Sequence, residues 1–303
     1  MNLQLTINMR PDWTTSRYNC KKLNLANNVC YDTVLLNHID QLLNSKKINF
    51  RQYPDEYIVY NTIAHYHLIN AKNIAVGYGL GELITRILKL KLIKKIAIVS
   101  PTWPMVEVFC KIFGISCCDH IDYSANAIYL ANPNGMDGSC LSQAEIINLL
   151  DKFELVIIDE AYGEFATIQY SVLDIAPVQS NLIVLKTFSK SLSLAGLRLG
   201  YAIANEDLIF ELQLNRPSCV VSSVSLSIIE ELFDLIPDHV SRMQATKHYI
   251  EQHYDCIASH GNYVLFKEMP DYFNNRIDVK EISTVAHRMA LTNLEIFKNE
   301  IEK

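Results

Sequence analysis

Two apolar stretches near the middle of the chain each end in side chains that can do chemistry. The first stretch, LVIIDEAYGEF, ends in Asp159 and Tyr162. The second begins LIVLKTFSK and ends in Thr187, Ser189 and Lys190. Such apolar runs are typical of buried parallel strands, whose carboxyl ends meet at one edge of an α/β sheet. A lysine placed there, among hydroxyl groups and close to a carboxylate, is suited to forming an imine with an aldehyde.

These residue types match, one by one, what pyridoxal 5'-phosphate (PLP) requires of a protein. A buried carboxylate such as Asp159 would keep the pyridine nitrogen protonated, so that the ring accepts electrons from the substrate. Tyr162 would donate a hydrogen bond to the phenolic oxygen of the ring. The hydroxyl groups of Thr187 and Ser189, and Arg198 after the helix-competent segment SLSLAGL, would bind the phosphate. The pattern therefore predicts a PLP site.

The longer segments around these residues resemble a known family. TFSKSLSLAGLRLGY resembles the lysine segment of the class I and II aminotransferases of PLP fold type I, and DEAYGEF resembles their aspartate segment. The resemblance is strongest to the branch of histidinol-phosphate aminotransferases and related phosphoamino-acid decarboxylases. It implies an α/β fold with a mostly parallel, doubly wound sheet in a large domain, together with a small α+β domain.

The resemblance covers nearly the whole chain of 303 residues, which is long enough for one large and one smaller domain. It implies an N-terminal arm and part of the small domain in residues 1–45, the large PLP-binding domain in residues 46–215, and a linking helix with the rest of the small domain in residues 216–303. The chain is shorter than typical members, with losses before Asn132 and in the C-terminal lobe.

Composition limits the partners and the compartment. The net charge is −6 and no basic cluster is dense enough to favour nucleic acid, so a small-molecule partner is expected. Eight cysteines without a Cys-x-x-Cys pair predict reduced thiols, and neither a disulfide framework nor a metal site is expected. No export signal and no apolar run of about 20 residues is evident, so we expect a cytoplasmic protein that does not enter a membrane.

A glycine-rich turn precedes one expected helix. Gly77, Gly79 and Gly81 follow the spacing G-x-G-x-G, which is not the dinucleotide-binding pattern. The free N–H groups at the start of a helix nevertheless suit one phosphate. The resemblance implies that the N–H groups of Leu80 and Gly81 bind the PLP phosphate and that Glu82 begins the helix. A purely structural glycine turn is the alternative.

The resemblance assigns three further cofactor contacts. Trp103 would stack on the pyridine ring, which suits an indole face against an electron-poor ring. Asn132, in an Asn-Pro-Asn turn, would bind the phenolic oxygen and adjoin the substrate. Tyr53, in a Tyr-Pro loop, would contact the phosphate in the neighbouring subunit, which implies a homodimer with shared sites. Ordinary core or loop packing is the alternative for Trp103 and Tyr53.

The segment AHRMALTNLEIFKNEI resembles the end of the family's chain, where an arginine binds the carboxylate or phosphate of the substrate. Arg288 is that arginine, while a second family arginine is absent or replaced by Lys280. We therefore predict an aminotransferase in which Lys190 carries PLP as a Schiff base and then moves the proton. The donor would be an amino acid or an amino-alcohol phosphate, and the acceptor a 2-oxo acid. A PLP-dependent phosphoamino-acid decarboxylase and a PLP-binding paralogue without activity are the alternatives.

Overall fold

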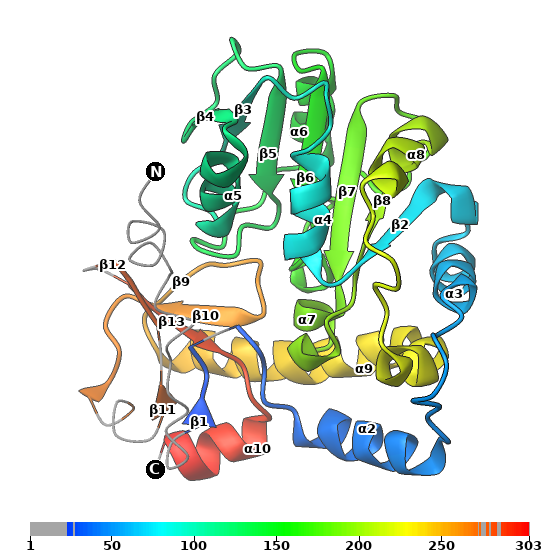
Figure 1. Cartoon of the computed structure of the whole chain (residues 1–303). Coiled ribbons are helices and arrows are strands. Elements are labelled where there is room, and N and C mark those ends of the chain that lie inside the picture. Colours follow the sequence, from blue (N-terminus) through cyan, green and yellow to red (C-terminus); the bar gives the residue numbers. More distant parts are fainter. Residues whose placement is uncertain are drawn as a thin grey trace.

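A computed structural model describes residues 23–302, except 27, 272, 274–276, 279 and 284–285. Its centre is a seven-stranded sheet of order β2-β8-β7-β6-β5-β3-β4 (Figure 1). The strands are β2 (Ile74–Gly77), β3 (Lys95–Ile98), β4 (Ser116–Cys118), β5 (Ala127–Ala131), β6 (Leu155–Asp159), β7 (Leu182–Thr187) and β8 (Gly200–Ile203). The strands from β7 to β4 are parallel, and β8 lies antiparallel between β7 and β2. This architecture confirms the predicted fold class.

Helices bury both faces of this sheet. One face packs against α4 (Leu80–Ile87), α5 (Met105–Phe113) and α8 (Glu206–Leu214), and the other against α3 (Tyr57–His67), α6 (Gln143–Leu150) and α9 (Ser223–His253). Within β6, Leu155 and Ile157 face the first group of helices, whereas Val156 and Ile158 face the second. Double coverage explains why the central parallel strands β5 and β6 are apolar almost to their carboxyl ends.

A smaller antiparallel sheet lies beside the large one, and α9 runs beneath both (Figure 1). Its order is β12-β13-β10-β9, formed by β12 (Lys280–Ser283), β13 (Ala286–Ala290), β10 (Tyr263–Phe266) and β9 (Cys256–Ile257). The chain ends in α10 (Leu294–Ile296) and a π-helical turn (Phe297–Ile301).

The beginning of the described chain joins these C-terminal elements. Strand β1 (Leu23–Asn24) pairs in parallel with β11 (Ile277–Asp278), and Tyr31 forms a bridge with Thr292 before α2 (Thr33–Ser45) begins. Segments from both parts of the chain thus lie side by side, as a small domain built from both would require. The predicted domain boundaries stay predictions. No helix in the described ranges is long and apolar enough to cross a bilayer.

The local structure differs from the sequence prediction after β7. The helix there is α7 (Phe188–Ser191), which contains Lys190, and SLSLAGL is not helical beyond its first residue except for a 3-10 turn (Ala195–Leu197). Thr187 caps the start of α7 by accepting a hydrogen bond from the Ser189 N–H group. Ser193 has φ of 56°, a left-handed conformation that prevents the helix from continuing.

Candidate functional site

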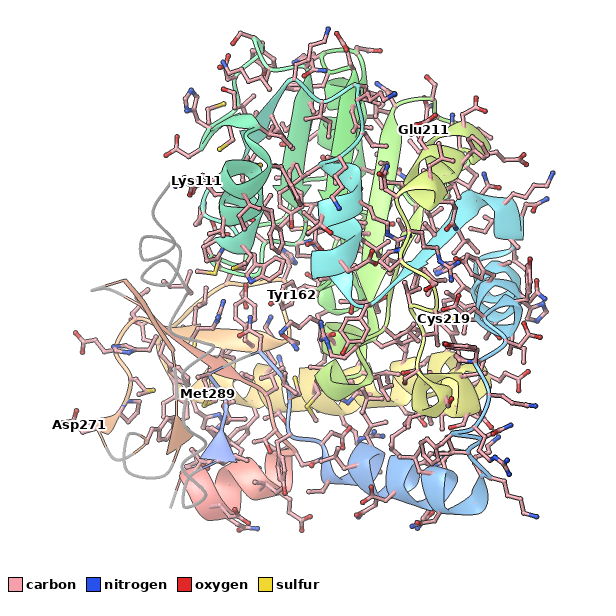
Figure 2. All side chains as sticks on the ribbon, in the orientation of Figure 1. Lys111, Tyr162, Glu211, Cys219, Asp271 and Met289 are labelled. Atoms are coloured by element: carbon pink, nitrogen blue, oxygen red, sulfur yellow. The ribbon has the colours of Figure 1, made fainter. Side chains whose placement is uncertain are left out.

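The carboxyl edge of the large sheet brings most of the predicted site residues together. Ala131 at the end of β5 lies opposite Asp159 at the end of β6, and the N–H group of Asn132 donates to the Asp159 carbonyl at 2.9 Å. Thr187 on β7 pairs with Gly200, which also pairs with Gly77 at the end of β2. Figure 2 shows Tyr162 at the end of the large sheet that faces the small sheet.

Asp159 is a buried carboxylate with two hydrogen-bond donors. The Tyr129 hydroxyl donates to Oδ2 at 2.6 Å, and the Ala161 N–H group donates to Oδ1 at 3.0 Å. Burial raises the pKa of Asp159, and these hydrogen bonds oppose the rise because they favour the ionised form. Sequence reasoning missed Tyr129, since a tyrosine within a buried strand gives no signal of its own.

Lys190 lies half-buried in α7. Its Nζ atom donates to the backbone carbonyl of Asn28 at 3.2 Å and lies 5.9 Å from the centre of the Tyr162 ring. Burial lowers the pKa of Lys190 to about 8, and the positive charge of Arg288 contributes. Near neutral pH this lysine therefore holds more of the neutral, nucleophilic amine than an exposed lysine does.

The glycine-rich turn forms a site for an anion. Helix α4 begins at Leu80, two residues before the predicted start at Glu82, because Gly79 at φ of 74° precedes it directly. The N–H groups of Leu80 and Gly81 thus belong to the first turn, where no intrahelical acceptor exists. A Cβ atom on Gly79 would lie only 2.5 Å from Nη2 of Arg198, so the guanidinium group flanks the turn.

Thr187 and Ser189 lie at the end of β7 and in α7, and Thr187 contacts the residue that follows Arg198. Their hydroxyl oxygens are 3.1 Å apart, and Thr187 also donates to the Leu199 carbonyl at 3.0 Å. Arg198 itself has φ of 55° and donates from Nη1 to the Ala195 carbonyl at 2.9 Å. Hydroxyl, guanidinium and helix N–H donors are therefore close to one turn, and this donor set fits a phosphate.

Trp103 and Asn132 flank this region. A Cβ atom on Gly81 would lie 3.3 Å from Cη2 of Trp103, so the indole ring touches the glycine turn. Asn132 is 1% exposed, and its amide group exchanges two hydrogen bonds with the backbone of Leu141, at 2.7 and 3.0 Å. The Asn132 nitrogen carries a second N–H group, which a cofactor oxygen could use.

Arg288 is a buried cation beside Lys190. It is 6% exposed, and its Nη1 atom donates to the Gly135 carbonyl at 2.5 Å and lies 3.4 Å from the sulfur of Met136. Its Nε atom makes no hydrogen bond within the described part of the chain. An arginine buried with an unused donor fits a site that receives an anion.

Tyr53 stands apart from this group. Tyr53 is 87% exposed and lines a separate cavity of about 290 Å³, together with Ser223 and Leu226. Within one chain the structure therefore does not bring Tyr53 to the site. Lys280 pairs with Arg288 in the register of β12 and β13, which places only its backbone.

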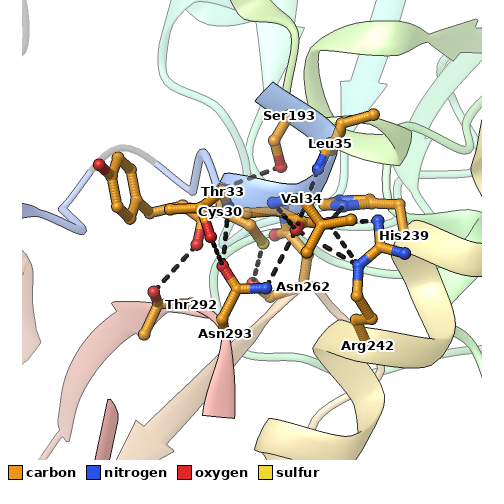
Figure 3. Close-up of polar contacts among 12 residues, drawn as sticks. Cys30, Thr33, Val34, Leu35, Ser193, His239, Arg242, Asn262, Thr292 and Asn293 are labelled. Atoms are coloured by element: carbon orange, nitrogen blue, oxygen red, sulfur yellow. Dashed lines mark hydrogen bonds and ion pairs between the residues drawn. The ribbon is translucent and has the colours of Figure 1, made fainter. Parts of the chain in front are cut away.

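The residues that precede α2 are held by a buried polar network that the sequence did not predict. Asp32 accepts hydrogen bonds from Arg242 and Asn293 and lies 2.8 Å from Nδ1 of His239 (Figure 3). Two residues earlier, the Cys30 N–H group donates to the Ser193 hydroxyl, which follows α7. The network anchors a segment that lies against Lys190. Its members are far apart in the sequence, so no local pattern reveals them.

Comparison with known proteins identifies the family of this chain. The family model for aminotransferase class I and II matches residues 21–267. The histidinol-phosphate aminotransferase of Pyrococcus furiosus is 32% identical over 247 residues, which are 73% of this chain and 72% of that protein. The matched part is 58% of a similar enzyme from Ruminiclostridium cellulolyticum and 53% of one from Thermococcus kodakarensis. Several relatives are thus matched over less than two thirds of their length.

Two solved structures share the fold. The histidinol-phosphate aminotransferase from Clostridium acetobutylicum superimposes with a TM-score of 0.77 at 20% identity, covering 92% of this chain and 97% of that chain. The enzyme from Sinorhizobium meliloti, solved in complex with pyridoxal-5'-phosphate, has a TM-score of 0.75 at 17% identity, covering 95% and 92%. The two structures confirm the predicted fold, and the family match with the Pyrococcus furiosus relative confirms the predicted enzyme class and its PLP cofactor. This chain belongs to the class I and II aminotransferase family and is a PLP-dependent aminotransferase.

Proposed function

We propose that this enzyme moves the amino group of an amino-alcohol phosphate such as histidinol phosphate, or of an amino acid, to a 2-oxo acid. The observation that supports this proposal most is the position of Arg288. A buried guanidinium group lies close enough to Lys190 to lower its pKa, and its Nε donor has no acceptor among the residues that the structure describes. A substrate with one amino group and one anionic group would suit such a pocket, because its amine would lie near Lys190 and its anion would bind Arg288.

The residues at the sheet edge would hold PLP by their chemistry. Asp159 would bind the protonated pyridine nitrogen, and Tyr162 and Asn132 would bind the phenolic oxygen. Thr187, Ser189, Arg198 and the N–H groups of Leu80 and Gly81 would bind the phosphate, while Trp103 would cover the ring. Bound PLP supplies the electron sink that this reaction needs.

Lys190 would have two tasks in this enzyme. Its neutral amine would bind the cofactor covalently, and once displaced by the substrate amine it would accept and return a proton at the substrate α-carbon. A pKa of about 8 suits both tasks, because the amine can lose and regain a proton near neutral pH. Arg288 would orient the substrate by binding its phosphate or carboxylate through two parallel hydrogen bonds.

The active unit would be a homodimer. Tyr53 is almost fully exposed in one chain, although the resemblance assigns it to a cofactor phosphate. A contact with the site of a second copy would explain both facts. Sedimentation of the active protein tests this step, and a fully active monomer would contradict it.

Borohydride reduction tests the lysine assignment. We expect reduction to fix PLP on Lys190, and mass spectrometry of the digested protein would locate the label. Lys186 is the matched control, because it lies four residues away and carries the same functional group. A label on Lys186 would contradict the proposal.

Donor assays test the reaction. The PLP-loaded protein would be incubated with histidinol phosphate, phosphothreonine or an amino acid, each with a 2-oxo acid. We expect the donor alone to convert the cofactor to its amine form, and the added 2-oxo acid to take up that amino group as a new amino acid and regenerate PLP. Release of carbon dioxide from phosphothreonine would instead indicate a decarboxylase. No change with any donor would indicate a paralogue without activity.

A further inference from the structure

Asn28 connects four separate segments at the site. Its side-chain nitrogen donates to the Tyr162 hydroxyl at 2.9 Å and to the Gly135 carbonyl at 3.3 Å. Its backbone carbonyl accepts hydrogen bonds from Nζ of Lys190 at 3.2 Å and from Nδ2 of Asn262 at 3.1 Å. The residue is 1% exposed. One asparagine thus contacts both the amine and the hydroxyl group to which the proposed function assigns chemistry.

The conformation of Asn28 is defined by its surroundings. Its φ is 52°, in the left-handed region where asparagine is several-fold enriched. Two residues on, the Cys30 N–H group donates to the Ser193 hydroxyl at 2.9 Å and its thiol lies 3.4 Å from the Asn262 carbonyl. The carbonyl of Asn28 therefore points at Lys190 because the backbone is held on its C-terminal side and by Asn262.

Each contact imposes a direction on its partner. A carbonyl that accepts one N–H of a neutral amine fixes the side from which the amine's lone pair can act. A hydroxyl oxygen that accepts a hydrogen bond from the Asn28 amide cannot donate back to that nitrogen, so the Tyr162 proton must point elsewhere. The proposed role of Tyr162 requires it to be a donor to the cofactor. The Asn28 amide enforces that orientation.

We propose that Asn28 is a positioning residue of this enzyme, whose carbonyl aims the Lys190 amine and whose amide nitrogen keeps the Tyr162 hydroxyl turned as a donor. This inference rests on the roles given above to Lys190 and Tyr162. The N-terminal segment thereby completes the site through one residue.

Two substitutions remove the amide contact with Tyr162 and leave the backbone carbonyl contact with Lys190 in place. Asn28→Gly keeps the left-handed backbone and its carbonyl but removes the amide that binds Tyr162. Asn28→Asp keeps the size and tolerates the same φ, but it replaces the donor nitrogen with an oxygen. The Tyr162 hydroxyl would then donate to the new carboxylate and turn away from the cofactor. We therefore expect kcat to fall roughly five- to hundredfold in Asn28→Gly and further in Asn28→Asp.

A second measurement uses the protein without PLP. Lys190 is surrounded by Arg288, Arg198, Asp159 and Cys30, and a new carboxylate at position 28 would add a negative charge. The pH midpoint for labelling of Lys190 by trinitrobenzenesulfonate, followed by mass spectrometry, should rise in Asn28→Asp and stay in place in Asn28→Gly. Because any carboxylate close to Nζ would raise the midpoint, this measurement tests the proximity of position 28 to Lys190, and kcat tests the positioning role.

The matched control is Asn73→Asp. Asn73 is also buried and donates to two backbone carbonyls, those of Pro177 and Ala204, but it lies at the opposite end of the sheet. We expect it to change stability without changing kcat or the Lys190 midpoint. The inference is overturned if Asn28→Gly keeps the kcat of the parent, or if Asn28→Asp labels with the parent midpoint. Failure of the proposed function would show separately, as absence of the borohydride label on Lys190 in the parent protein.

Discussion

Replacing Asp32 by alanine would remove the carboxylate that holds the N-terminal segment against α9. Asp32 is 1% exposed and accepts hydrogen bonds from Nη2 of Arg242 at 2.7 Å and from Nδ2 of Asn293 at 3.0 Å. Nδ1 of His239, itself fully buried, lies 2.8 Å from it (Figure 3). The same carboxylate caps α2 by accepting from two N–H groups of its first turn.

The loss of stability in Asp32→Ala depends on the groups that lose their partner. Removing one partner of a buried ion pair costs about 3–5 kcal/mol, because the other charge is left buried. Arg242 keeps a side chain that is 30% exposed, so water would compensate part of that loss. Loss of the helix cap adds about 1 kcal/mol, and the two effects share one carboxylate and are not additive. We expect the free energy of unfolding to fall by about 2–4 kcal/mol.

Urea unfolding followed by circular dichroism measures this change. A loss of that size corresponds to a decrease of roughly 1 M in the urea midpoint of Asp32→Ala. Asp119→Ala is the matched control, because the Asp119 side chain is 87% exposed and contacts only His120 in the described structure. We expect the control to keep the parent midpoint. Equal midpoints for the two variants would show that the Asp32 network does not stabilise the fold.

The effect should also depend on pH. Burial alone would raise the pKa of Asp32, but the hydrogen bonds from His239, Arg242 and Asn293 lower it below its ordinary value. A carboxylate with a depressed pKa stabilises the folded state above the unfolded pKa of about 3.9 and loses this contribution as pH falls through the folded pKa. The difference in stability between the parent and Asp32→Asn should therefore be constant from pH 8 to about pH 5 and shrink below it.

Three further predictions test the site. Tyr129→Phe should weaken PLP binding roughly tenfold at pH 7, because a charge-assisted hydrogen bond to Asp159 is lost and the Asp159 pKa rises further. The affinity for PLP should recover as pH rises, and a dissociation constant equal to that of the parent at every pH would contradict this. Arg288→Ala should raise KM for the amino donor at least tenfold, because two charged hydrogen bonds to the donor are lost. The affinity for PLP, measured by absorbance titration, should not change, and loss of PLP would show that Arg288 has a structural role. Mixing inactive Tyr53→Ala and Lys190→Ala homodimers should restore roughly a quarter of the activity, because about half of the dimers become mixed and each mixed dimer has one complete site of two. If no activity is restored, the site is not shared between subunits.

The strands and the chemistry at their ends could be predicted from the sequence. A strand covered on both faces is mostly apolar, so Asp159 at the end of β6 and Lys190 just after β7 are easy to recognise. Parallel pairing then brings both to one edge. The glycine turn was predicted as well, although the start of α4 was placed two residues late.

Contacts between distant segments could not be predicted. Asn28 contacts Tyr162 and Lys190 because the first described part of the chain packs against the C-terminal elements. The residues next to Asn28 in the sequence do not indicate these contacts. Tyr129 looks like any aromatic residue of a buried strand. The helix expected over SLSLAGL is broken because Ser193 takes a left-handed conformation. The sequence around Ser193 is compatible with a helix and does not indicate this conformation.

The contrast between Lys186 and Lys190 shows how the fold selects one lysine for chemistry. Lys186 is 7% exposed, and its Nζ atom lies 2.9 Å from Glu164 and 3.6 Å from Glu160. Burial alone would lower its pKa, but these carboxylates raise it well above the ordinary value, so the amine stays protonated and cannot act as a nucleophile.

Lys190 has the opposite environment, although it is only four residues away. Strand alternation directs Lys186 to the face covered by α9, with Val184, whereas the turn at Thr187 places Lys190 beyond the strand end. There burial lowers its pKa to about 8, and the positive charge of Arg288 contributes more to this shift than any other charged group. The sheet edge therefore gives Lys190 both its position at the site and its lowered pKa, whereas Lys186, within the strand, has neither.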